Sequence, residues 1–519
     1  MKNLTRGKIL TNIELLVLNL PNSPGRKVNR DYAGGFGTAI PLSTIRRKQS
    51  GKPFLNLFLP YSAAVAQEAG CECKVVDAQA LKLTKHNILQ TVKKYDPSLV
   101  ISMISLPSLH DDKKTLTEIK QTLPNTLTVA CGTVCNVIPE EVLNGSNIDL
   151  VINDYFPYVN SLHLLLTNLQ NPDDVNKLPG TSYKKGNKIF TNTPKPAQKQ
   201  FTDYKPIYDI LPLTEYETIT ISDKKCSAIP ILGSSGCPFS CPYCPYPIGF
   251  GSKAIFKHPK TTVDEIEHLN QMGIKSFGFR NQSFTLNQKW AIDVCKEITD
   301  RKLDVSWACE AKVDETTKEI LTTMHKSGCR RIHYGVETGD PTIIETAKPG
   351  VSLQNTNESF KTAREIGIWR HAHIILGLPG ETQKTLETTS KFLLKIDPDS
   401  VTLNFATPYP GTKMHEDAKK NNWITTNDWG HYSSFDIVME TPSIRADDLY
   451  KTAMQIEKSL AHQKIRQLLA TGLSIRKAES IADHYRQIAT TQINYRNRIR
   501  NFYKRQRKEQ KQEDFQVQS

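Results

Sequence analysis

Three cysteines stand close together in the stretch ILGSSGCPFSCPYCPYPIG, which covers residues 231–249. Cys237, Cys241 and Cys244 have the spacing C-x3-C-x2-C, with prolines and aromatic residues between them. Thiolates at this density can bind zinc, hold an iron–sulfur cluster or form a disulfide. Because the chain has only 11 cysteines in all, three in one short loop point to a shared ligand.

The number of cysteines favours a cluster over zinc. A structural zinc site uses four protein ligands, usually in two C-x2-C pairs, and Cys226 is the nearest candidate for a fourth. An iron–sulfur cluster can be held by three thiolates, which leaves one iron free for an outside ligand. Zinc and three unrelated core cysteines remain the alternatives. We therefore expect a [4Fe-4S] cluster with one open iron at this loop.

The cysteine loop follows the first of six strand-like segments. These segments alternate with helix-like ones between residues 222 and 425 and read AIPILGS, KSFGFR, DVSWACE, RRIHYGVE, RHAHIILG and SVTLNFA. Six strand–helix units in series predict an open, partial (β/α)6 barrel, in which the chemistry sits in loops after the strands. In one helix, TTVDEIEHLNQMG, we expect Thr262 and Glu265 to form a capping box and Gly273 to end the helix.

The regions on either side of this barrel have different patterns. Residues 1–190 also alternate apolar strands with amphipathic helices, which predicts an α/β domain with a doubly wound, Rossmann-like parallel sheet. Ligands of such sheets bind at the carboxyl ends of the strands. Residues 191–221 are rich in proline and lack periodicity, so we expect a linker. Residues 426–519 are expected to form a helical, basic C-terminal region.

The composition is that of a globular protein with an excess of positive charge. Charged residues make up 23% and apolar residues 38% of the 519 positions, and the net charge is +14. Much of the excess lies in YRNRIRNFYKRQRKEQKQ, where a solvated basic helix or tail is the simplest interpretation. No apolar run reaches the roughly 18 residues that span a membrane, and the N-terminal sequence lacks a signal-peptide pattern. These features predict a cytoplasmic protein with reduced thiols.

The cysteine spacing, with Tyr243 before the last cysteine, resembles that of the radical S-adenosylmethionine (SAM) enzymes. DVSWACEAKVD, SGCRRIHYGVETGD, IILGLPGET and ATPYPGT look like strand-end motifs of the subgroup with an N-terminal cobalamin-binding domain. RDYAGGFG and IPEEVL match the N-terminal half of that subgroup, so the resemblance covers roughly residues 10–425. It implies three cofactors: a [4Fe-4S] cluster, SAM at the open iron, and cobalamin in the first domain.

The resemblance also implies which carboxylates contact SAM. Glu310 and Glu337 end the third and fourth strands of the barrel, where they can accept hydrogen bonds from the ribose or the amino group. A buried ion pair with Lys312 or Arg331 is the alternative explanation for these two residues.

Amide side chains replace the acidic residues that the relatives typically carry after the second strand of the barrel. Asn281 and Gln282 can bond the SAM ammonium group without charge assistance, or they can serve the substrate instead. The other implied SAM contacts are Tyr243, Leu376 and Gly377.

Cobalamin-binding domains often carry Asp-x-His-x-x-Gly, whose histidine is the lower ligand of cobalt. The matching stretch here is DAQALK, in which Asp77 is kept, Gln79 replaces the histidine and Lys82 replaces the glycine. Any bound cobalamin is therefore expected to lack a lower histidine, as is common in the radical SAM relatives. The other implied cobalamin contacts are Ser102, Ser105 and Gly132.

These expectations predict a cobalamin-dependent radical SAM methyltransferase. A 5′-deoxyadenosyl radical would take hydrogen from an sp3 carbon, which would then receive methyl from methylcobalamin. The first alternative is a ring-forming or oxidative enzyme with the same cofactors, of the porphyrin-ring or lipid-ring type. The second is a tRNA methylthiotransferase-like enzyme, whose three additional cluster cysteines are not supplied by the pairs Cys71/Cys73 and Cys131/Cys135. No catalytic residue is assigned.

The expected partners follow from the same resemblance. The substrate is expected to be a small molecule, a lipid or a peptide, and the electron donor a low-potential flavodoxin or ferredoxin. Nucleic acid is not an expected partner, although a cluster-bearing or cobalamin-bearing sensor with a nucleic-acid-binding tail is a non-enzyme alternative. The basic C-terminal region would suit a peripheral contact with an acidic membrane.

Overall fold

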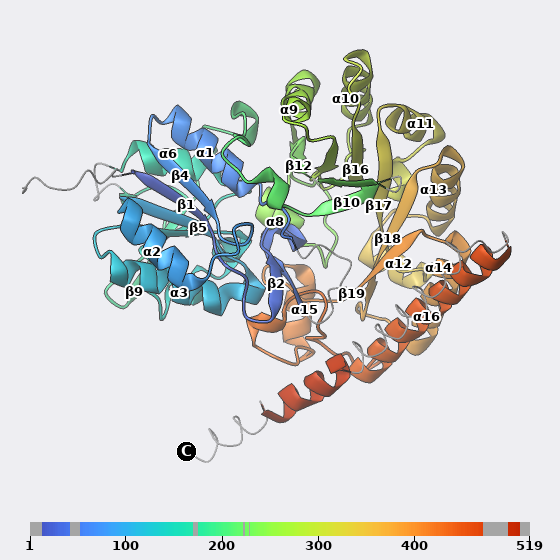
Figure 1. The fold of residues 1–519 in the computed structure, drawn as a ribbon. Coiled ribbons are helices and arrows are strands. Elements are labelled where there is room, and N and C mark those ends of the chain that lie inside the picture. Colours follow the sequence, from blue (N-terminus) through green and yellow to red (C-terminus); the bar gives the residue numbers. More distant parts are fainter. Residues whose placement is uncertain are drawn as a thin grey trace, which may run out of the picture.

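Two large β-sheets, each with helices packed against it, make up most of the molecule (Figure 1). The computed structural model describes residues 13–41, 52–169, 175–221, 224–227, 229–470 and 497–508. Both sheets are built mainly of parallel strands that alternate with helices along the chain. The α/β class predicted from the sequence is therefore confirmed.

The first sheet has seven strands in the order β4-β1-β5-β6-β7-β8-β9. The first five in this order are parallel, whereas β8 and β9 join antiparallel at one edge. All five residues of β1 and of β5 are buried, because helices cover both faces of a parallel sheet. The strands are β1 Leu15–Asn19, β4 Cys73–Asp77, β5 Leu99–Met103, β6 Leu127–Cys131, β7 Leu150–Ile152, β8 Thr181–Lys185 and β9 Lys188–Thr191.

Helices α1 and α6 lie on one face of this sheet, and α2 and α3 lie on the other (Figure 1). The α2 helix begins with a capping box, in which the Thr84 side chain accepts a hydrogen bond from the Asn87 backbone N–H. The helices are α1 Phe58–Glu68, α2 Lys85–Tyr95, α3 Leu109–Thr122, α4 Thr133–Val137, α5 Pro139–Leu143 and α6 Val159–Thr167.

A short hairpin covers the carboxyl ends of two strands of the first sheet. Its strands are β2 (Arg26–Asn29) and β3 (Thr38–Pro41), and the segment between them, residues 30–37, lies over β5 and β6. The Leu106 N–H donates to the Phe36 carbonyl at 2.7 Å, and the Thr133 hydroxyl donates to the Gly34 carbonyl at 2.6 Å. These contacts place the hairpin between the first sheet and the second.

The second sheet has six parallel strands in sequential order, β12-β15-β16-β17-β18-β19. The connecting helices α9, α10, α11, α13 and α14 surround its outer side (Figure 1). The strands are β12 Ile229–Ile231, β15 Ser276–Phe279, β16 Ser306–Ala311, β17 Cys329–Glu337, β18 Trp369–Leu376 and β19 Ser400–Phe405. The helices are α8 Tyr246–Phe250, α9 Pro259–Gln271, α10 Gln288–Asp300, α11 Lys318–Lys326, α12 Pro341–Ala347, α13 Leu353–Ile366, α14 Gln383–Ile396 and α15 Lys413–Lys420.

The α9 helix begins earlier than the sequence pattern indicated. The predicted capping box of Thr262 and Glu265 is wrong, because the helix begins at Pro259 with His258 as its N-cap. Proline at the first helical position has its φ already set and loses no N–H bond. Glu265 is buried instead and forms an ion pair with Lys257 at 2.7 Å.

The later part of the stretch predicted to be a linker, residues 201–217, is packed into the core, whereas residues 191–200 are mostly exposed. Tyr208 and Tyr216 are fully buried, and their hydroxyls reach opposite parts of the fold. The Tyr208 hydroxyl donates to Glu265 at 2.6 Å, whereas that of Tyr216 donates to Asp77, at the end of β4, at 3.0 Å. Residues 191–221 therefore connect the two sheets through side chains as well as through the backbone.

The predicted helical C-terminal region begins later than expected, because residues 426–445 form mostly loops and turns and the chain becomes helical only from Ala446. Helix α16 (Ala446–Ala470) packs against α14, and residues 497–508 form a further helical stretch. The rest of the predicted basic region lies outside the described residues. Within the described part of the chain, no helix combines the length and the apolar character needed to cross a membrane.

Candidate active site

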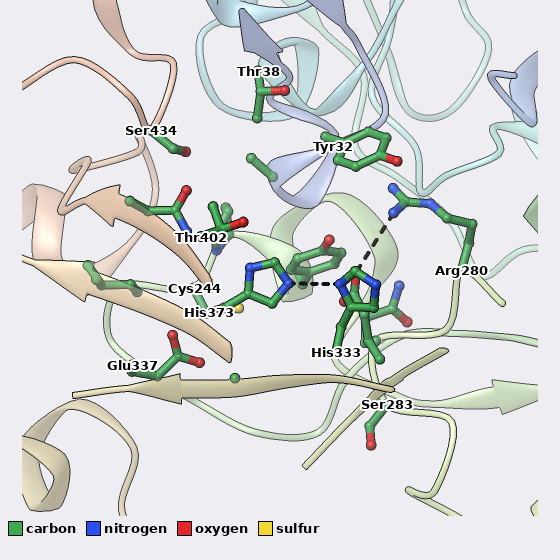
Figure 2. Close-up of a pocket in the computed structure, with 18 of the residues that line it drawn as sticks. Tyr32, Thr38, Cys244, Arg280, Ser283, His333, Glu337, His373, Thr402 and Ser434 are labelled. Atoms are coloured by element: carbon green, nitrogen blue, oxygen red, sulfur yellow. Dashed lines mark hydrogen bonds and ion pairs between the residues drawn. The ribbon is translucent and has the colours of Figure 1, made fainter. Parts of the chain in front are cut away.

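A cavity of about 590 Å³ lies between the second sheet and the β2–β3 hairpin (Figure 2). Its walls come from the cysteine loop, from all the strands from β15 to β19, and from the hairpin residues Tyr32, Ala33 and Thr38. The carboxyl ends of parallel strands are where such folds place their ligands. This cavity is therefore the candidate active site.

The three cysteines of the predicted cluster line one wall of the cavity. All three are free thiols, and hydrogen bonds from the Cys237 N–H to the Gly251 carbonyl and from the Cys244 N–H to the Cys241 carbonyl fold the loop back on itself. Burial raises the pKa of each thiol, so a bound cation or cluster is needed to keep all three as thiolates. Their convergence on one wall fits the predicted cluster.

Two lysines offset the negative charge that three thiolates would bring. Lys348 and Lys312 both lower the pKa of Cys237 and Cys241, against the larger effect of burial. The Lys312 ammonium lies 3.8 Å from the ring centroid of Phe239, in the cysteine loop itself. Lys348 donates a hydrogen bond of 2.7 Å to the Gly335 carbonyl.

Glu337 is held in an unusual backbone conformation at the end of β17. Its φ is +63°, and the pairing with β18 shifts register between Gly335 and Glu337, as in a β-bulge. The carboxylate folds back to Lys348, 3.2 Å from the ammonium nitrogen. A Cβ on Gly335 would lie 2.4 Å from this carboxylate, so glycine is required for the contact.

Glu310 also lines the cavity, but its partner differs from the one expected. Arg280 lies 3.8 Å from the Glu310 carboxylate and 3.9 Å from that of Asp31. The guanidinium also stacks on Tyr32, 4.1 Å from the ring centroid. The ion pairs of the two glutamates are thus formed by Arg280 and Lys348 rather than by Lys312 and Arg331.

The two amides expected to bind SAM have different surroundings. Gln282 lines the cavity, and neither its amide oxygen nor its amide nitrogen has a hydrogen-bond partner among the described residues. Asn281 is 1% exposed and accepts a hydrogen bond from the Gly233 N–H, just before the cysteine loop. Gln282 is therefore available to a ligand, whereas Asn281 supports the backbone from which the loop starts.

Tyr243 lines the cavity, whereas Leu376 and Gly377 do not. Leu376 is fully buried, and the Gly377 N–H donates to the Glu381 carboxylate at 2.6 Å. With a φ of +89°, Gly377 forms the tight turn after β18. The structure thus brings Tyr243, Gln282, Glu310 and Glu337 into one cavity with the cysteines. Leu376 and Gly377 lie outside the cavity lining.

The profile of the radical SAM superfamily matches residues 231–393, which contain the three cysteines and the strands β15 to β18. Residues 231–393 of this chain therefore form a radical SAM domain. Such a domain implies a [4Fe-4S] cluster and SAM as cofactors, in agreement with the cysteine loop at the cavity wall.

Among curated relatives, this radical SAM enzyme is similar to proteins named as methyltransferases and cyclases. It is 29% identical to an uncharacterized methyltransferase of Pyrococcus horikoshii, over 76% of this chain and 85% of the relative. It is 23% identical to an anaerobic magnesium-protoporphyrin IX monomethyl ester cyclase of Cereibacter sphaeroides, over 78% of this chain and 68% of the cyclase. The predicted resemblance to methyltransferase-like radical SAM enzymes is confirmed.

Two solved structures share the fold over most of the chain. The radical SAM methyltransferase TsrM of Kitasatospora setae, with cobalamin and a [4Fe-4S] cluster, matches with a TM-score of 0.64 and 15% identity over 87% of this chain and 89% of TsrM. The cobalamin-dependent radical enzyme OxsB, with aqua-cobalamin, matches with a TM-score of 0.68 and 14% identity over 93% of this chain and 72% of OxsB. At these identities the likeness shows a common fold.

The four expected cobalamin contacts of this radical SAM enzyme do not lie together. Gln79 lines a second cavity, of about 640 Å³, and its amide nitrogen is buried without a partner among the described residues. Lys82 has a φ of +53°, the left-handed conformation that glycine favours, which matches the glycine of the cobalamin pattern.

The other three expected contacts are enclosed in the protein. Ser102 and Ser105 are fully buried, and a Cβ on Gly132 would lie 2.4 Å from the Ile104 carbonyl oxygen. The β2–β3 hairpin covers this end of the sheet, since a Cβ on Gly37 would lie 2.5 Å from the Ser105 Cβ. Of the four residues, Gln79 alone lines either of the two cavities.

Three histidines of the cavity were missed by the sequence analysis. His333 on β17 and His371 and His373 on β18 line the cavity, and their ligand nitrogens lie within 4.8 Å of one another. Figure 2 shows His333 and His373 side by side in the cavity. A signal was present, because RHAH places two histidines at strand spacing, on one face of β18. Only the parallel pairing of β17 with β18 brings the third beside them.

Proposed function

We propose that this radical SAM enzyme is a cobalamin-dependent C-methyltransferase that acts on an unactivated sp3 carbon. The observation that carries the proposal is the cavity itself. One wall has the three cysteines and the polar groups suited to SAM, and the opposite side is formed by the N-terminal domain. The resemblance to curated bacteriochlorophyllide methyltransferases and to a hopanoid C-2 methylase supports methylation.

The domain limits are part of the proposal. Residues 1–190 would form the cobalamin-binding-like domain, 191–221 the linker, 222–425 the partial (β/α)6 radical SAM barrel and 426–519 the helical basic region. The sequential order of the six parallel strands supports the barrel. The buried tyrosines of the linker imply that the two domains hold a fixed relation during the reaction.

In this proposal Cys237, Cys241 and Cys244 would hold the cluster. When bound, the cluster would supply the electron that cleaves SAM into methionine and a 5′-deoxyadenosyl radical. Gln282, Glu310, Glu337 and Tyr243 line the same wall and would orient SAM.

The protein's own residues determine the charge of the site and exclude water from it. Lys348 holds the Glu337 carboxylate in place, and it acts on the cysteines as a nearby positive charge. Arg280 and Tyr32 close the side that faces the N-terminal domain. Apolar side chains line much of the rest and would keep water from a reactive radical; they include Phe54, Leu55, Ile375, Phe405 and Met414.

Cobalamin would supply the methyl group. Gln79, with its unpaired amide nitrogen on the 640 Å³ cavity, is the one expected contact that fits a bound group. Ser102, Ser105 and Gly132 do not fit direct contact unless the β2–β3 hairpin moves, so we assign them no step. The likeness of the fold to two cobalamin-bearing structures supports this part of the proposal.

The proposed setting is the cytoplasm, with a small-molecule substrate and a low-potential flavodoxin or ferredoxin as electron donor. A contact of the basic C-terminal region with an acidic membrane is also a proposal, and it concerns mostly residues outside the described ones.

The test is anaerobic reconstitution with iron, sulfide and hydroxocobalamin, followed by a count of iron and cobalt. The proposal expects about four irons and near-stoichiometric cobalt, and 5′-deoxyadenosine together with S-adenosylhomocysteine once SAM and a reductant are added. Cys241→Ser should lose iron and 5′-deoxyadenosine, whereas Cys71→Ser, a matched change in the first domain, should keep both. Iron without cobalt, or 5′-deoxyadenosine without S-adenosylhomocysteine, would exclude methylcobalamin chemistry and favour a cyclase or an oxidative reaction.

A further inference from the structure

The floor of the active-site cavity carries a group of polar residues that the cofactors do not use. Arg331 and His333 on β17, His371 and His373 on β18, and Thr402 on β19 line this region. Arg331 precedes Glu337 by six residues on one strand, which places it about 20 Å from the cluster end at about 3.3 Å per residue. Arg331 is therefore well separated from Glu337, whereas His333 lies next to Glu310 across the pairing of β16 with β17.

Three neighbouring histidines would ordinarily suggest a metal ion, but the hydrogen bonds of His371 are against one. Its Nδ1 lies 2.7 Å from the Ser400 hydroxyl, which already accepts hydrogen bonds from Arg331 and from the Trp369 indole N–H. A hydroxyl has two acceptor sites and one hydrogen, so Ser400 must donate to His371. His371 is then the neutral tautomer with its hydrogen on Nε2.

The remaining hydrogen of His371 determines the direction of the hydrogen bonds that run from Ser400 through His371 to Thr402. Its Nε2–H donates to the Thr402 hydroxyl at 2.9 Å, so both ring nitrogens are engaged and neither is free for a metal. Among the described residues the Thr402 hydroxyl hydrogen has no acceptor, and Thr402 lines the cavity. This series of hydrogen bonds thus ends in the Thr402 O–H donor at the cavity floor.

His333 and His373 form a second hydrogen-bonded pair. The His333 Nδ1 and the His373 Nε2 lie 3.4 Å apart and share one hydrogen (Figure 2). Each neutral ring carries one hydrogen, so whichever ring donates, one outer nitrogen of the pair bears a hydrogen and the other is bare. The pair therefore always offers one further N–H donor.

Arg331 adds a positive charge that lacks a close carboxylate. Its Nε is buried without a hydrogen-bond partner, and among the described residues no carboxylate lies within 4.0 Å of the guanidinium. Asp399, whose charge acts on Arg331, is engaged by Arg370 at 2.9 Å. A half-buried cation with an unused N–H donor disfavours a second cation beside it and favours an anion.

We propose that this floor binds the anionic group of the substrate, a carboxylate or a phosphate, whose apolar body extends toward the cluster. Arg331 supplies charge and an N–H donor, Thr402 an O–H donor, and the His333–His373 pair an N–H donor. The inference rests on the proposed function, because it assigns the substrate end of the same cavity. It also limits the substrate class to amphipathic anions.

Binding of an anion should be accompanied by proton uptake. Burial holds the pKa of all three histidines below its ordinary value, and a bound anion would raise it. The charged groups that act on these rings, besides the rings themselves, are Arg280, Glu310, Arg331, Glu337 and Lys348. Since the bare outer nitrogen of the His333–His373 pair is the available acceptor, uptake should not exceed one proton.

The test is calorimetric titration of the reconstituted protein, with SAM but without reductant, in two buffers of different ionisation enthalpy. The probes are octanoate, octyl phosphate and octan-1-ol, which share an apolar chain and differ in the head group. We expect at least one of the anions to bind more than about tenfold tighter than the alcohol, with proton uptake. Comparison of the two anions distinguishes a carboxylate from a phosphate site.

Three variants and a control complete the experiment. Arg331→Gln should remove the preference for the anion, and Arg331→Lys should retain part of it, while Thr402→Val should weaken binding with the charge intact. Arg330→Gln is the matched control, because the adjacent Arg330 donates to the His325 and Cys329 carbonyls and does not line the cavity. Folding of each variant is checked by circular dichroism.

Three results would overturn the inference. They are equal binding of octan-1-ol and both anions, a preference for the anion that survives Arg331→Gln, and zinc retained after chelation in wild type but not in His373→Ala. Because no radical chemistry is required, Cys241→Ser should still bind the anion. Failure of the methyltransferase proposal and failure of the anion site can therefore be told apart.

Discussion

At the scale of single residues, the pairing of Lys348 with Glu337 determines the charge next to the cysteine loop. Both side chains are about nine-tenths buried, and the glutamate adopts a left-handed backbone conformation to reach the lysine. The sequence showed each residue but gave no reason to pair them, because Lys348 lies after α12 and Glu337 at the end of a strand.

Replacing Lys348 with methionine should leave the Glu337 carboxylate buried without its cation. We expect the free energy of unfolding to fall by about 3 kcal/mol, since a buried charge that loses its partner is costly. Chemical denaturation followed by circular dichroism measures this change. Binding of SAM to the reconstituted enzyme should weaken as well, because Glu337 loses its fixed position.

The double variant Lys348→Met/Glu337→Gln should recover part of the lost stability, as it removes the unpaired charge. Lys361→Met is a suitable control, because Lys361 is 74% exposed and its ion pair with Glu365 is long, at 4.0 Å. Such exposed pairs contribute little to stability. An equal loss of unfolding free energy in Lys348→Met and Lys361→Met would show that the buried ion pair contributes no more to stability than the exposed one.

At the scale of elements, the turn after β18 depends on a buried carboxyl group. Glu381 is fully buried, and one of its oxygens accepts hydrogen bonds from the Gly377 and Leu378 N–H groups, while the other has no partner among the described residues. Burial raises the pKa of Glu381 to about 8. The turn therefore holds a carboxyl group that is protonated near neutral pH.

The pH dependence of stability should reveal this group. Between its ordinary pKa of 4.5 and the folded value of about 8, the folded chain binds a proton that the unfolded chain has released. The free energy of unfolding should therefore fall as pH rises through this window. Glu381→Gln cannot ionise, so its denaturation curves should depend less on pH there than those of wild type.

Glu387→Gln, an exposed change in the next helix, serves as the control for this measurement. A stability that falls from pH 5 to pH 8 as steeply in Glu381→Gln as in wild type and in Glu387→Gln would contradict the assignment.

Elements were the scale at which sequence patterns succeeded best. Buried apolar strands such as LLVLN and LVISM, separated by amphipathic helices, sufficed to predict the α/β class, because their periods of burial depend on local geometry. The start of α9 was mispredicted for the opposite reason. Glu265 has the spacing of a cap residue, but a lysine outside the helix, Lys257, engages it in the core.

At the scale of the whole molecule, close backbone contact joins the first domain to the cluster loop. Gly34, in the β2–β3 hairpin, approaches so closely that an added Cβ would lie 2.7 Å from the Pro245 carbonyl carbon. On the other side, a Cβ on Gly249 would lie 2.1 Å from the Gly34 carbonyl oxygen. Two glycines thus allow the domains to meet next to the cysteines.

Gly34→Ala should push the β2–β3 hairpin away from the cysteine loop and impair the active site. We expect less 5′-deoxyadenosine and a lower iron count after reconstitution, because the loop that carries Cys244 loses its support from the hairpin. Gly25→Ala is a matched control, since Gly25 has a similar φ, +72° against +65°, but open space around its Cβ position. In both variants alanine in the left-handed conformation costs about 1 kcal/mol. Equal iron counts and equal activity in the two would show that the contact between the hairpin and the cysteine loop is unimportant.

The sequence by itself determined the chemistry class, because three thiols within one short loop are local and their spacing is readable without a fold. It also determined the α/β class, since strand and helix periods are local too. The tertiary structure decided which residues share the cavity. It placed Gln282, Glu310 and Glu337 beside the cysteines, enclosed Ser102, Ser105 and Gly132, and gathered three histidines and Arg331 at the floor. The physical reason is that parallel pairing sets neighbours by register across strands far apart in the chain, which spacing along one segment cannot show.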